Sequence, residues 1–368
     1  MNIFSFFSGA GFLDLGFETA GDYKVVYVNE YHEPFNEIYR YAREKMGIPS
    51  PLFGHHIKDI TSLLEEPEVS RLRELVEKSK QRDLTGFIGG PPCPDFSVAG
   101  KNKGRDGENG KLSGSYVDLI CTMQPDFFLF ENVKGLYRTK RHRAFFEELK
   151  AKLVDNGYYL TEQLVNSLEF GVPQDRDRIL LIGIHEEIVQ ERNLPVMPGN
   201  IVGFPWESYK KYKKDDIFKL TWPTQDTFEK GTFKPAPDGI IEDLTVQYWW
   251  EKNDVASHPN QHMYFVPKAA KVIFENKDEG DVDKKCYKRL HRHRFSPTAA
   301  YGNNEVHIHP YEPRRISVAE ALAIQSLPKE YEIPLDSTLT NAFKTIGNGV
   351  PYLVANAIAR AIRDFIML

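Results

Sequence analysis

Residues 2–17 read Asn-Ile-Phe-Ser-Phe-Phe-Ser-Gly-Ala-Gly-Phe-Leu-Asp-Leu-Gly-Phe, and this stretch decides the fold class. The apolar run 2–7 is suited to a buried strand, and the glycines that follow allow a turn that opens a helix. In a doubly wound sheet, such a turn brings the backbone close to a ligand at the carboxyl end of the strand. The sequence therefore predicts that a βαβ unit opens the chain.

The glycine turn and the next apolar run together indicate the class of ligand. The dinucleotide fingerprint lacks its third glycine, because Phe12, Leu13 and Asp14 follow Gly11. Glu30 closes the next run, at a place where a carboxylate characteristically accepts hydrogen bonds from ribose hydroxyls. A nucleoside cofactor without a pyrophosphate fits this pattern, and S-adenosylmethionine is the common one. A strand-to-helix turn without a ligand is the alternative.

Short apolar runs alternate with helical patterns as far as residue 185, which is the rhythm of a doubly wound, mostly parallel α/β sheet. The runs expected to form strands are 2–7, 24–29, 84–88, 126–130 and 179–184. The segments expected to form helices are 34–45, 68–79, 116–123 and 144–156. Prolines, tryptophans and lysine runs without sustained periodicity dominate residues 186–290, and helical patterns return at 317–327 and 350–367.

This organisation predicts three parts of the chain. Residues 1–187 would form a catalytic and cofactor-binding domain on a Rossmann-like sheet. Residues 188–340 would form a smaller, irregular domain, and residues 341–368 a helix that returns to the first domain. A length of 368 residues agrees with more than one ordinary core.

Composition restricts the function classes. A hydrophobic content of 41% with 27% charged residues is typical of a soluble globular protein. No apolar run reaches membrane-spanning length and the start lacks a signal peptide, so we expect a cytoplasmic protein without a membrane partner. The three cysteines are odd in number and widely spaced, which fits neither a disulfide framework nor a metal site.

The charge distribution is uneven although the net charge is only −5. Basic clusters occupy residues 138–143, 210–214 and 284–294. Each cluster alone could be a solvated face. Three of them around an enzyme-like core favour phosphate binding.

Cys93 lies in the run Gly-Gly-Pro-Pro-Cys-Pro directly after the strand expected at 84–88. Prolines on both sides prevent a helix or a central strand, so the thiol is left at the end of a strand. Glu131 follows the strand expected at 126–130, and a thiol and a carboxylate would meet at one sheet edge if the two strands are neighbours. Arg176 and Arg178 open a further strand on one face, where two guanidiniums would favour the ionised thiol.

A glycine-rich segment follows the candidate nucleophile. Residues 99–114 contain five glycines together with Lys101, Lys103 and Arg105. This composition predicts a mobile basic lid that closes against a polyanion. A surface loop without a role would have the same composition.

Eight short motifs along the chain occur in an order that resembles the DNA cytosine-5 methyltransferase family, of the prokaryotic or phage modification type. The resemblance extends over nearly the whole chain except about 100 residues in the middle. The matching segments are 7–11, 29–30, 59–60, 91–93, 131–133, 174–178, 314–328 and 347–351. The resemblance implies a methyltransferase fold with a smaller DNA-recognition domain, S-adenosylmethionine as cofactor and duplex DNA as substrate.

The resemblance also implies roles for individual residues. Cys93 would attack carbon 6 of a flipped cytosine, Glu131 would hold or protonate the ring at N3, Arg178 would contact the base, and Arg176 would support the thiolate or nearby backbone. The substrate contacts implied or expected from the lid are Ser97, Lys101, Lys103 and Arg105. The implied cofactor contacts are Phe7, Gly9, Gly11, Glu30, Tyr31, Asp59, Ile60, Pro92 and Asn348.

Three other functions remain open at this stage. A cytosine-5 methyltransferase acting on transfer RNA would keep the chemistry, but the long middle region favours duplex DNA. A nicotinamide-dependent oxidoreductase is disfavoured by the incomplete glycine fingerprint. A DNA-binding module without activity is disfavoured by the intact candidate catalytic residues. We expect a monomer, with a cognate restriction endonuclease as a functional partner.

Overall fold

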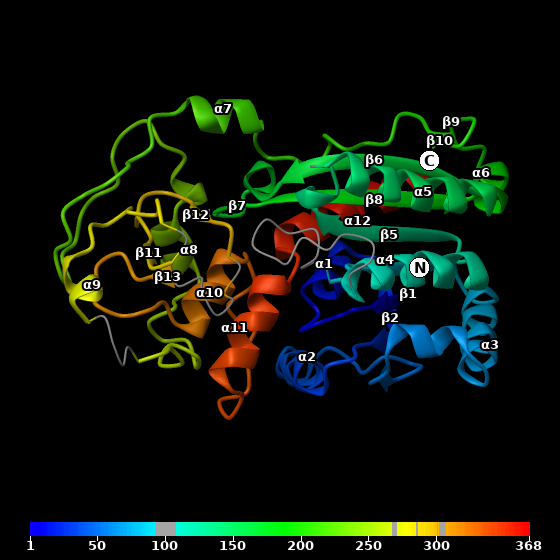
Figure 1. Ribbon diagram of the computed structural model, residues 1–368, viewed down its shortest axis with the longest axis horizontal. Coiled ribbons are helices and arrows are strands. Elements are labelled where there is room, and N and C mark those ends of the chain that lie inside the picture. Colours follow the sequence, from blue (N-terminus) through cyan, green and yellow to red (C-terminus); the bar gives the residue numbers. More distant parts are fainter. Residues whose placement is uncertain (93–107, 138, 267–270, 285, 300, 302–306) are drawn as a thin grey trace.

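A nine-stranded sheet forms the centre of the computed structural model (Figure 1), which describes residues 1–92, 108–137, 139–266, 271–284, 286–299, 301 and 307–368. The strand order is β3-β2-β1-β4-β5-β8-β6-β10-β9. The strands are β1 (Asn2–Phe6), β2 (Lys24–Asn29), β3 (His55–His56), β4 (Thr85–Gly89), β5 (Phe127–Val133), β6 (Tyr158–Asn166), β8 (Asp177–His185), β9 (Val196–Met197) and β10 (Asn200–Ile201).

Most neighbouring strands of the sheet are parallel, as the sequence predicts. The strands from β3 to β5 pair in parallel, whereas β8 is antiparallel to both β5 and β6, and β9 is antiparallel to β10. Residues 158–166 were not expected to form a strand, because polar residues interrupt the apolar pattern of β6. The prediction that β4 and β5 are neighbouring strands is confirmed. The predicted proximity of residues 93 and 131 depends on this pairing.

Helices cover both faces of the sheet, because adjacent strand residues point to opposite sides. On one face Leu129 of β5 joins a core with α1 (Phe12–Ala20), α6 (Glu186–Glu191) and α12 (Tyr352–Ile366). On the other face Phe128 joins a core with α3 (Glu68–Lys80), α4 (Glu108–Met123) and α5 (Lys140–Asp155). The helices α1 and α12 pack closely, since a Cβ on Gly16 would lie 2.3 Å from the Cβ of Ala355.

The rest of the chain has short elements, in agreement with its irregular pattern. It contains α7 (Lys214–Lys219), α8 (Val246–Lys252), α9 (Lys271–Asn276), α10 (Val318–Ile324) and α11 (Leu339–Asn348). The short strands outside the large sheet are β7 (Gln174–Asp175), β11 (Lys288–Arg289), β12 (Ser296–Pro297) and β13 (His307–Ile308). Figure 1 shows α7, α8 and α9 beyond one end of the large sheet, with α10 and α11 between them and α2 (Glu33–Lys45).

The chain crosses between these two parts at several places. The large sheet includes β9 and β10, so the chain stays with it as far as Ile201 and not only to residue 187. A core of α8, α10 and α11 includes Phe12 of α1 and Ile38 of α2, which joins the second part to the first. The domain limits stay a prediction. Within the described ranges, no helix combines the length and apolar content needed to cross a bilayer.

Candidate active site

The carboxyl ends of β4 and β5 bring a carboxylate, a guanidinium and a glycine together. Glu131 is 7% exposed, and its Oε1 lies 2.8 Å from Nε of Arg178 on the neighbouring strand β8. A Cβ built on Gly90 would lie 2.7 Å from Oε2 of the same carboxylate. A side chain at position 90 would therefore require the Glu131 carboxylate or the backbone after β4 to shift. Cys93, three positions further on, lies outside the described residues.

Among the described residues, Arg176 binds backbone carbonyl groups and no carboxylate. It is 1% exposed, and its guanidinium donates hydrogen bonds to the carbonyl oxygens of Ala299 (3.2 Å), Gly347 (3.0 Å) and Gly349 (3.1 Å). Burial and, to a lesser extent, the charge of Arg178 lower the pKa of Arg176 well below its ordinary value. The arginine thus holds together two segments that are far apart in sequence.

The strand expected to contain both arginines is two strands in the structure. One of them, β7, pairs with β12, while β8 belongs to the large sheet, and Arg176 lies between them. The prediction of a single strand is therefore wrong in this detail. Its cause is the pairing of β7 with a segment more than 100 residues away, which the local alternation of side chains does not reveal.

The glycine turn after β1 is fixed by Glu30 at the end of β2. The Glu30 carboxylate accepts hydrogen bonds from the backbone N–H groups of Gly9 and His32, both at 2.8 Å. Burial raises the pKa of Glu30, and these two hydrogen bonds oppose the rise. Phe7 and Gly9 have positive φ angles of 51° and 56°, so the chain turns sharply beside the carboxylate.

Gly11 has a packing reason for its identity. A Cβ at this position would lie 2.4 Å from the ring of Tyr39 on α2, and its φ of 78° also disfavours a side chain. A Cβ on Gly9, in contrast, would come only within 3.7 Å of Thr345. The space around Gly9 is therefore compatible with the approach of a ligand, whereas Gly11 serves the contact between the turn and α2.

Asp59 and Ile60 lie beside the end of β2. The side chain of Asn29 donates to the carbonyl oxygens of His56 and Lys58, which fixes the segment that leads to Asp59. Oδ1 of Asp59 accepts from the backbone N–H of Thr61, while Oδ2 makes no hydrogen bond within the described part of the chain. One carboxylate oxygen thus remains available as an acceptor. Ile60 is 2% exposed and packs in the core.

The remaining cofactor candidates surround this turn at different depths. Tyr31, 70% exposed, follows Glu30 directly, and Pro92 is exposed after β4. Asn348 is exposed at the end of α11, close to Thr345. The hydroxyls of Ser8 and Thr345 are buried without a hydrogen-bond partner among the described residues. Unsatisfied hydroxyls next to an open glycine turn fit a polar ligand at this edge of the sheet.

The expected lid falls largely outside the structural description. Ser97, Lys101, Lys103 and Arg105 are in the segment 93–107, whose structure is not described. The end of the expected lid is wrong, because α4 begins at Glu108 and includes Gly114. A Cβ on Gly114 would meet no atom of the described part of the chain within 4 Å.

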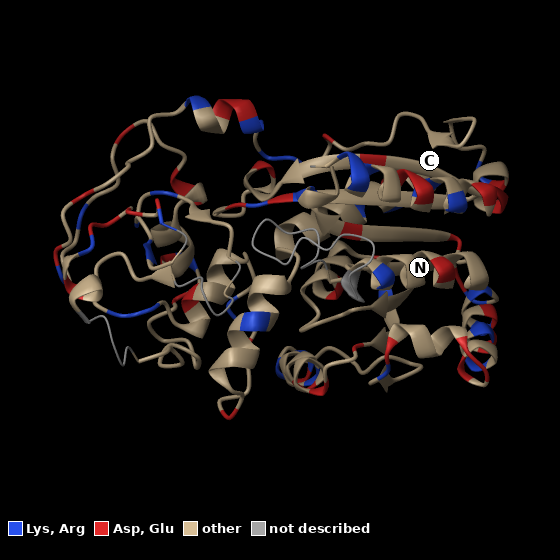
Figure 2. Cartoon of the chain, viewed as in Figure 1, with Lys and Arg blue, Asp and Glu red and all other residues tan. Residues whose placement is uncertain are grey.

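The basic cluster 210–214 is paired with carboxylates in the structure, although Figure 2 shows basic residues on this part of the chain. Lys210 lies 3.2 Å from Glu169, and Lys211 forms an ion pair with Asp243. The predicted role of this cluster in binding phosphate is therefore not supported for these two lysines. Their positive charges stabilise contacts within the protein.

The cluster 284–294 is also mainly internal. Arg289 is fully buried and donates hydrogen bonds to the carbonyl oxygens of His309 and Glu312, at 2.6 and 3.1 Å. Arg292 is 2% exposed and forms an ion pair of 2.8 Å with Glu279. A count of charges along the sequence cannot separate such buried arginines from arginines that face a polyanion. Of the third cluster, Lys140 and Arg143 are exposed at the start of α5.

Asp177 was not a candidate in the sequence, but it connects three segments near Glu131. Its carboxylate accepts hydrogen bonds from Lys134 (2.8 Å), Lys214 (2.7 Å) and the amide of Asn166 (2.9 Å). Burial alone would raise the pKa of Asp177, yet the two lysines and Asn166 lower it to about 2. No local signal could have identified this residue, because its partners lie on β6, on α7 and after β5.

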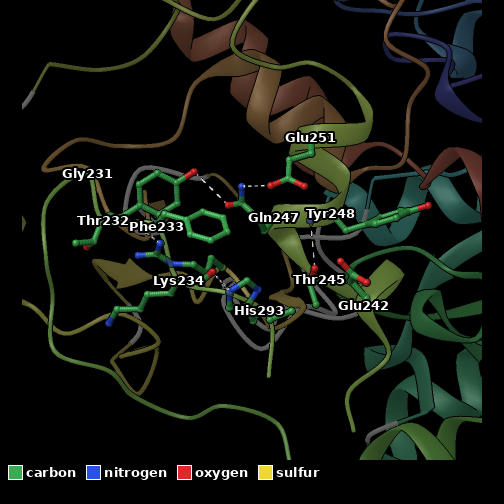
Figure 3. Close-up of a pocket in the computed structure, with 13 residues that line it drawn as sticks. Gly231, Thr232, Phe233, Lys234, Glu242, Thr245, Gln247, Tyr248, Glu251 and His293 are labelled. Carbon is green, nitrogen blue, oxygen red and sulfur yellow. Dashed lines mark hydrogen bonds between the residues drawn. The ribbon is translucent and has the colours of Figure 1, made fainter. Parts of the chain in front are cut away.

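A separate pocket lies in the second part of the chain (Figure 3). Its volume is about 260 Å³, and its walls come from α8, the segment 231–236 and residues near Arg292. The polar groups in it bind one another, since Gln247 donates to Glu251 and accepts from Tyr311. None of the residues that line it belongs to the predicted site.

The glycine turn with its carboxylate and the Glu131–Arg178 pair lie at the carboxyl ends of the strands, where proteins with an open α/β sheet bind their ligands. The chain belongs to the C-5 cytosine-specific DNA methylase family, whose sequence profile matches residues 1–364. The family resemblance of the sequence is thereby confirmed, and the chain is a DNA cytosine-5 methyltransferase. The alternative of a nicotinamide-dependent oxidoreductase is therefore wrong.

Individual relatives agree with this assignment. The chain is 55% identical to the Type II methyltransferase M.NmeDI of Neisseria meningitidis serogroup C, over 99% of this chain and 84% of the relative. It is 29% identical to the Type II methyltransferase M.FnuDI of Fusobacterium nucleatum, over 99% and 94% of the two chains. A solved structure of a protein described as a DNA modification methyltransferase from an E. coli prophage has a TM-score of 0.67 at 22% identity, with complete coverage of both chains, and shows the same fold.

Proposed function

We propose that this enzyme methylates carbon 5 of a flipped cytosine in duplex DNA at a specific sequence, through a covalent adduct between Cys93 and carbon 6. The observation that carries the proposal is the contact of Gly90 with Glu131, which is itself paired with Arg178 at 2.8 Å. Gly90, three positions before Cys93, thus lies beside a carboxylate and a guanidinium. Extrusion of the base is needed because carbon 5 is not accessible for this chemistry within a duplex.

The chemistry assigned to the side chains balances in electrons and protons. The Cys93 thiolate would form a bond to carbon 6, which moves the electrons of the C5–C6 double bond towards N3, where Glu131 holds or supplies a proton. Carbon 5 would then form a bond to the methyl group, the electron pair of the broken bond would stay with the methyl donor, and the N3 proton would return to Glu131. A base removes the proton from carbon 5, the double bond re-forms and the thiolate leaves. Arg178 would orient Glu131 and contact the base, and Arg176 would support the backbone around the site.

The residues at the glycine turn fit S-adenosylmethionine, which would supply a methyl group bound to a sulfonium. Glu30 has lone pairs left for ribose hydroxyls, because each of its oxygens accepts one backbone hydrogen bond in the structure. Asp59 offers its Oδ2 to an exocyclic amine. Phe7, Gly9, Tyr31, Ile60, Pro92 and Asn348 would form the rest of the pocket, and Gly11 would shape it through its contact with Tyr39.

Covalent trapping tests the proposal. The protein is incubated with S-adenosylmethionine and a long duplex in which 5-fluorocytosine replaces cytosine, and adducts are separated on a denaturing gel. We expect a covalent complex with wild-type protein and none with Cys93→Ser. The absence of a complex with active wild-type protein would refute the adduct. Methyl transfer to transfer RNA in place of DNA would establish the alternative substrate.

We also propose that the enzyme is a monomer that acts in a Type II restriction-modification system beside a cognate endonuclease. The likeness to M.NmeDI and M.FnuDI supports this setting. Ser97, Lys101, Lys103 and Arg105 would contact the DNA backbone near the flipped base. Light scattering tests the oligomeric state, and bisulfite sequencing of DNA from cells that express the chain gives the methylated position and its context.

A further inference from the structure

The backbone of the glycine turn is held from inside the protein by two side chains that belong to neither the turn nor the predicted cofactor pocket. The hydroxyl of Tyr331 donates a hydrogen bond of 2.6 Å to the carbonyl oxygen of Ala10. The guanidinium of Arg43 on α2 donates a hydrogen bond of 3.0 Å to the carbonyl oxygen of Gly11. Two consecutive carbonyl groups of the turn therefore have fixed partners.

Tyr331 is well placed to act as a rigid support. It is fully buried, and its ring packs edge to face on Phe12, with ring centroids 5.2 Å apart. Its own backbone carbonyl is hydrogen bonded to the ring of His258, and the neighbouring Ile333 is held by the side chain of Asn260. The second part of the chain thus fixes the position of the hydroxyl that reaches Ala10.

Arg43 holds the next residue of the turn through a buried charge. Its side chain is 5% exposed, forms an ion pair of 3.0 Å with Glu18 and stacks over the ring of Tyr39 at 4.4 Å. Tyr39 in turn donates to Asp14 at the start of α1. This network keeps α1, α2 and the turn in one arrangement.

We propose that Tyr331 is a positioning residue for the cofactor turn and acts through the carbonyl of Ala10. The inference rests on the proposed function, because it assumes that the turn receives S-adenosylmethionine. With the carbonyls of Ala10 and Gly11 bound on the inside, the N–H of Gly9 stays directed at Glu30. Loss of the Tyr331 hydroxyl frees the turn to adopt other conformations, and the cofactor then has to select the competent one, which weakens its apparent affinity.

The chain offers a matched control for this test. Tyr23 is also buried, its hydroxyl donates a hydrogen bond of 2.7 Å to the carbonyl oxygen of Ala359, and its ring packs edge to face on Phe17 at 5.0 Å. This tyrosine precedes β2 and lies at the amino ends of the strands, away from the turn. Tyr331→Phe and Tyr23→Phe therefore remove the same group from similar surroundings.

The test compares the two variants by calorimetric titration with S-adenosylmethionine and by hydrogen exchange of the backbone amides of residues 8–11 without any cofactor. We expect Tyr331→Phe to weaken cofactor binding by about three- to tenfold, the range of one hydrogen bond, and to accelerate exchange in the turn. Tyr23→Phe should change neither the cofactor affinity nor the exchange of the turn, even if it lowers the melting temperature by as much as Tyr331→Phe does.

The outcomes separate this inference from the proposed function. If the wild type binds S-adenosylmethionine and Tyr331→Phe binds it equally well with unchanged exchange in the turn, the positioning role is overturned alone. If both variants weaken binding to the same degree, the effect is one of general stability and the role is again overturned. If the wild type does not bind S-adenosylmethionine, the cofactor assignment fails and this inference fails with it.

Discussion

Replacement of Gly90 by alanine is the sharpest test of the active-site geometry. The added Cβ would lie 2.7 Å from Oε2 of Glu131, a separation too short for any relaxed contact. The carboxylate can withdraw only by weakening its 2.8 Å ion pair with Arg178, since both side chains are largely buried, at 10% and 14% exposure. The other response is a shift of the backbone that leads to Cys93. Either movement displaces a group that the proposed chemistry needs.

The expected size of the effect follows from the buried pair. Removal of one partner of a buried pair costs about 3–5 kcal/mol of folding stability, which is an upper limit for displacing a carboxylate whose partner is kept. A loss of about 3 kcal/mol of transition-state stabilisation corresponds to a fall in kcat on the order of 100-fold. The assay measures the transfer of labelled methyl groups from S-adenosylmethionine to long unmethylated DNA, with cofactor affinity measured separately. We expect Gly90→Ala to lower kcat and to leave cofactor affinity nearly unchanged.

Gly114→Ala is the control, because it adds the same methyl group to α4 at a place where no atom of the described residues lies within 4 Å. An alanine in a helix is more favourable than glycine by about 1 kcal/mol, so this variant should be at least as stable as wild type and fully active. Wild-type kcat in Gly90→Ala would refute the argument. So would an equal loss of activity in Gly114→Ala.

Two further predictions concern stability and pH. Burial raises the pKa of Glu18 from 4.5 to about 7, although the charge of Arg43 opposes the rise. Between these two pH values the folded state therefore binds more protons than the unfolded state. The free energy of unfolding should fall as the pH rises from 5 to 7. Glu18→Gln should flatten this dependence in urea titrations at pH 5 and 8, and an unaltered slope would contradict it. Asp177 has its pKa lowered to about 2, so its stabilisation is present above the ordinary value of 3.8 and is lost only as pH falls towards 2. Asp177→Asn should therefore lower the free energy of unfolding equally at pH 5 and pH 8. The expected loss is about 1 kcal/mol, because the partners Lys134 and Lys214 are partly exposed. A loss of stability seen only at pH 8 would argue against the assigned pKa.

The sequence alone determined the parallel centre of the main sheet and the residues that follow its strands. The apolar runs at residues 2–7, 24–29 and 126–130 form β1, β2 and β5 within one or a few residues. Glu30 and Glu131 could be selected because each follows such a run, and the carboxyl ends of neighbouring parallel strands meet at one edge. These features are local, since they depend on the period of apolar residues and on the residue that ends the run.

Tertiary structure alone decided which side chains are partners. The sequence predicted phosphate contacts for three basic clusters, yet Lys210 and Arg292, from two of them, bind carboxylates within the protein. Tyr331 and Ala10 are separated by 321 positions, and no periodicity connects them. The physical reason is that the free energy of a polar group depends on the partner and the degree of burial that the fold provides, and both are set by contacts between distant segments.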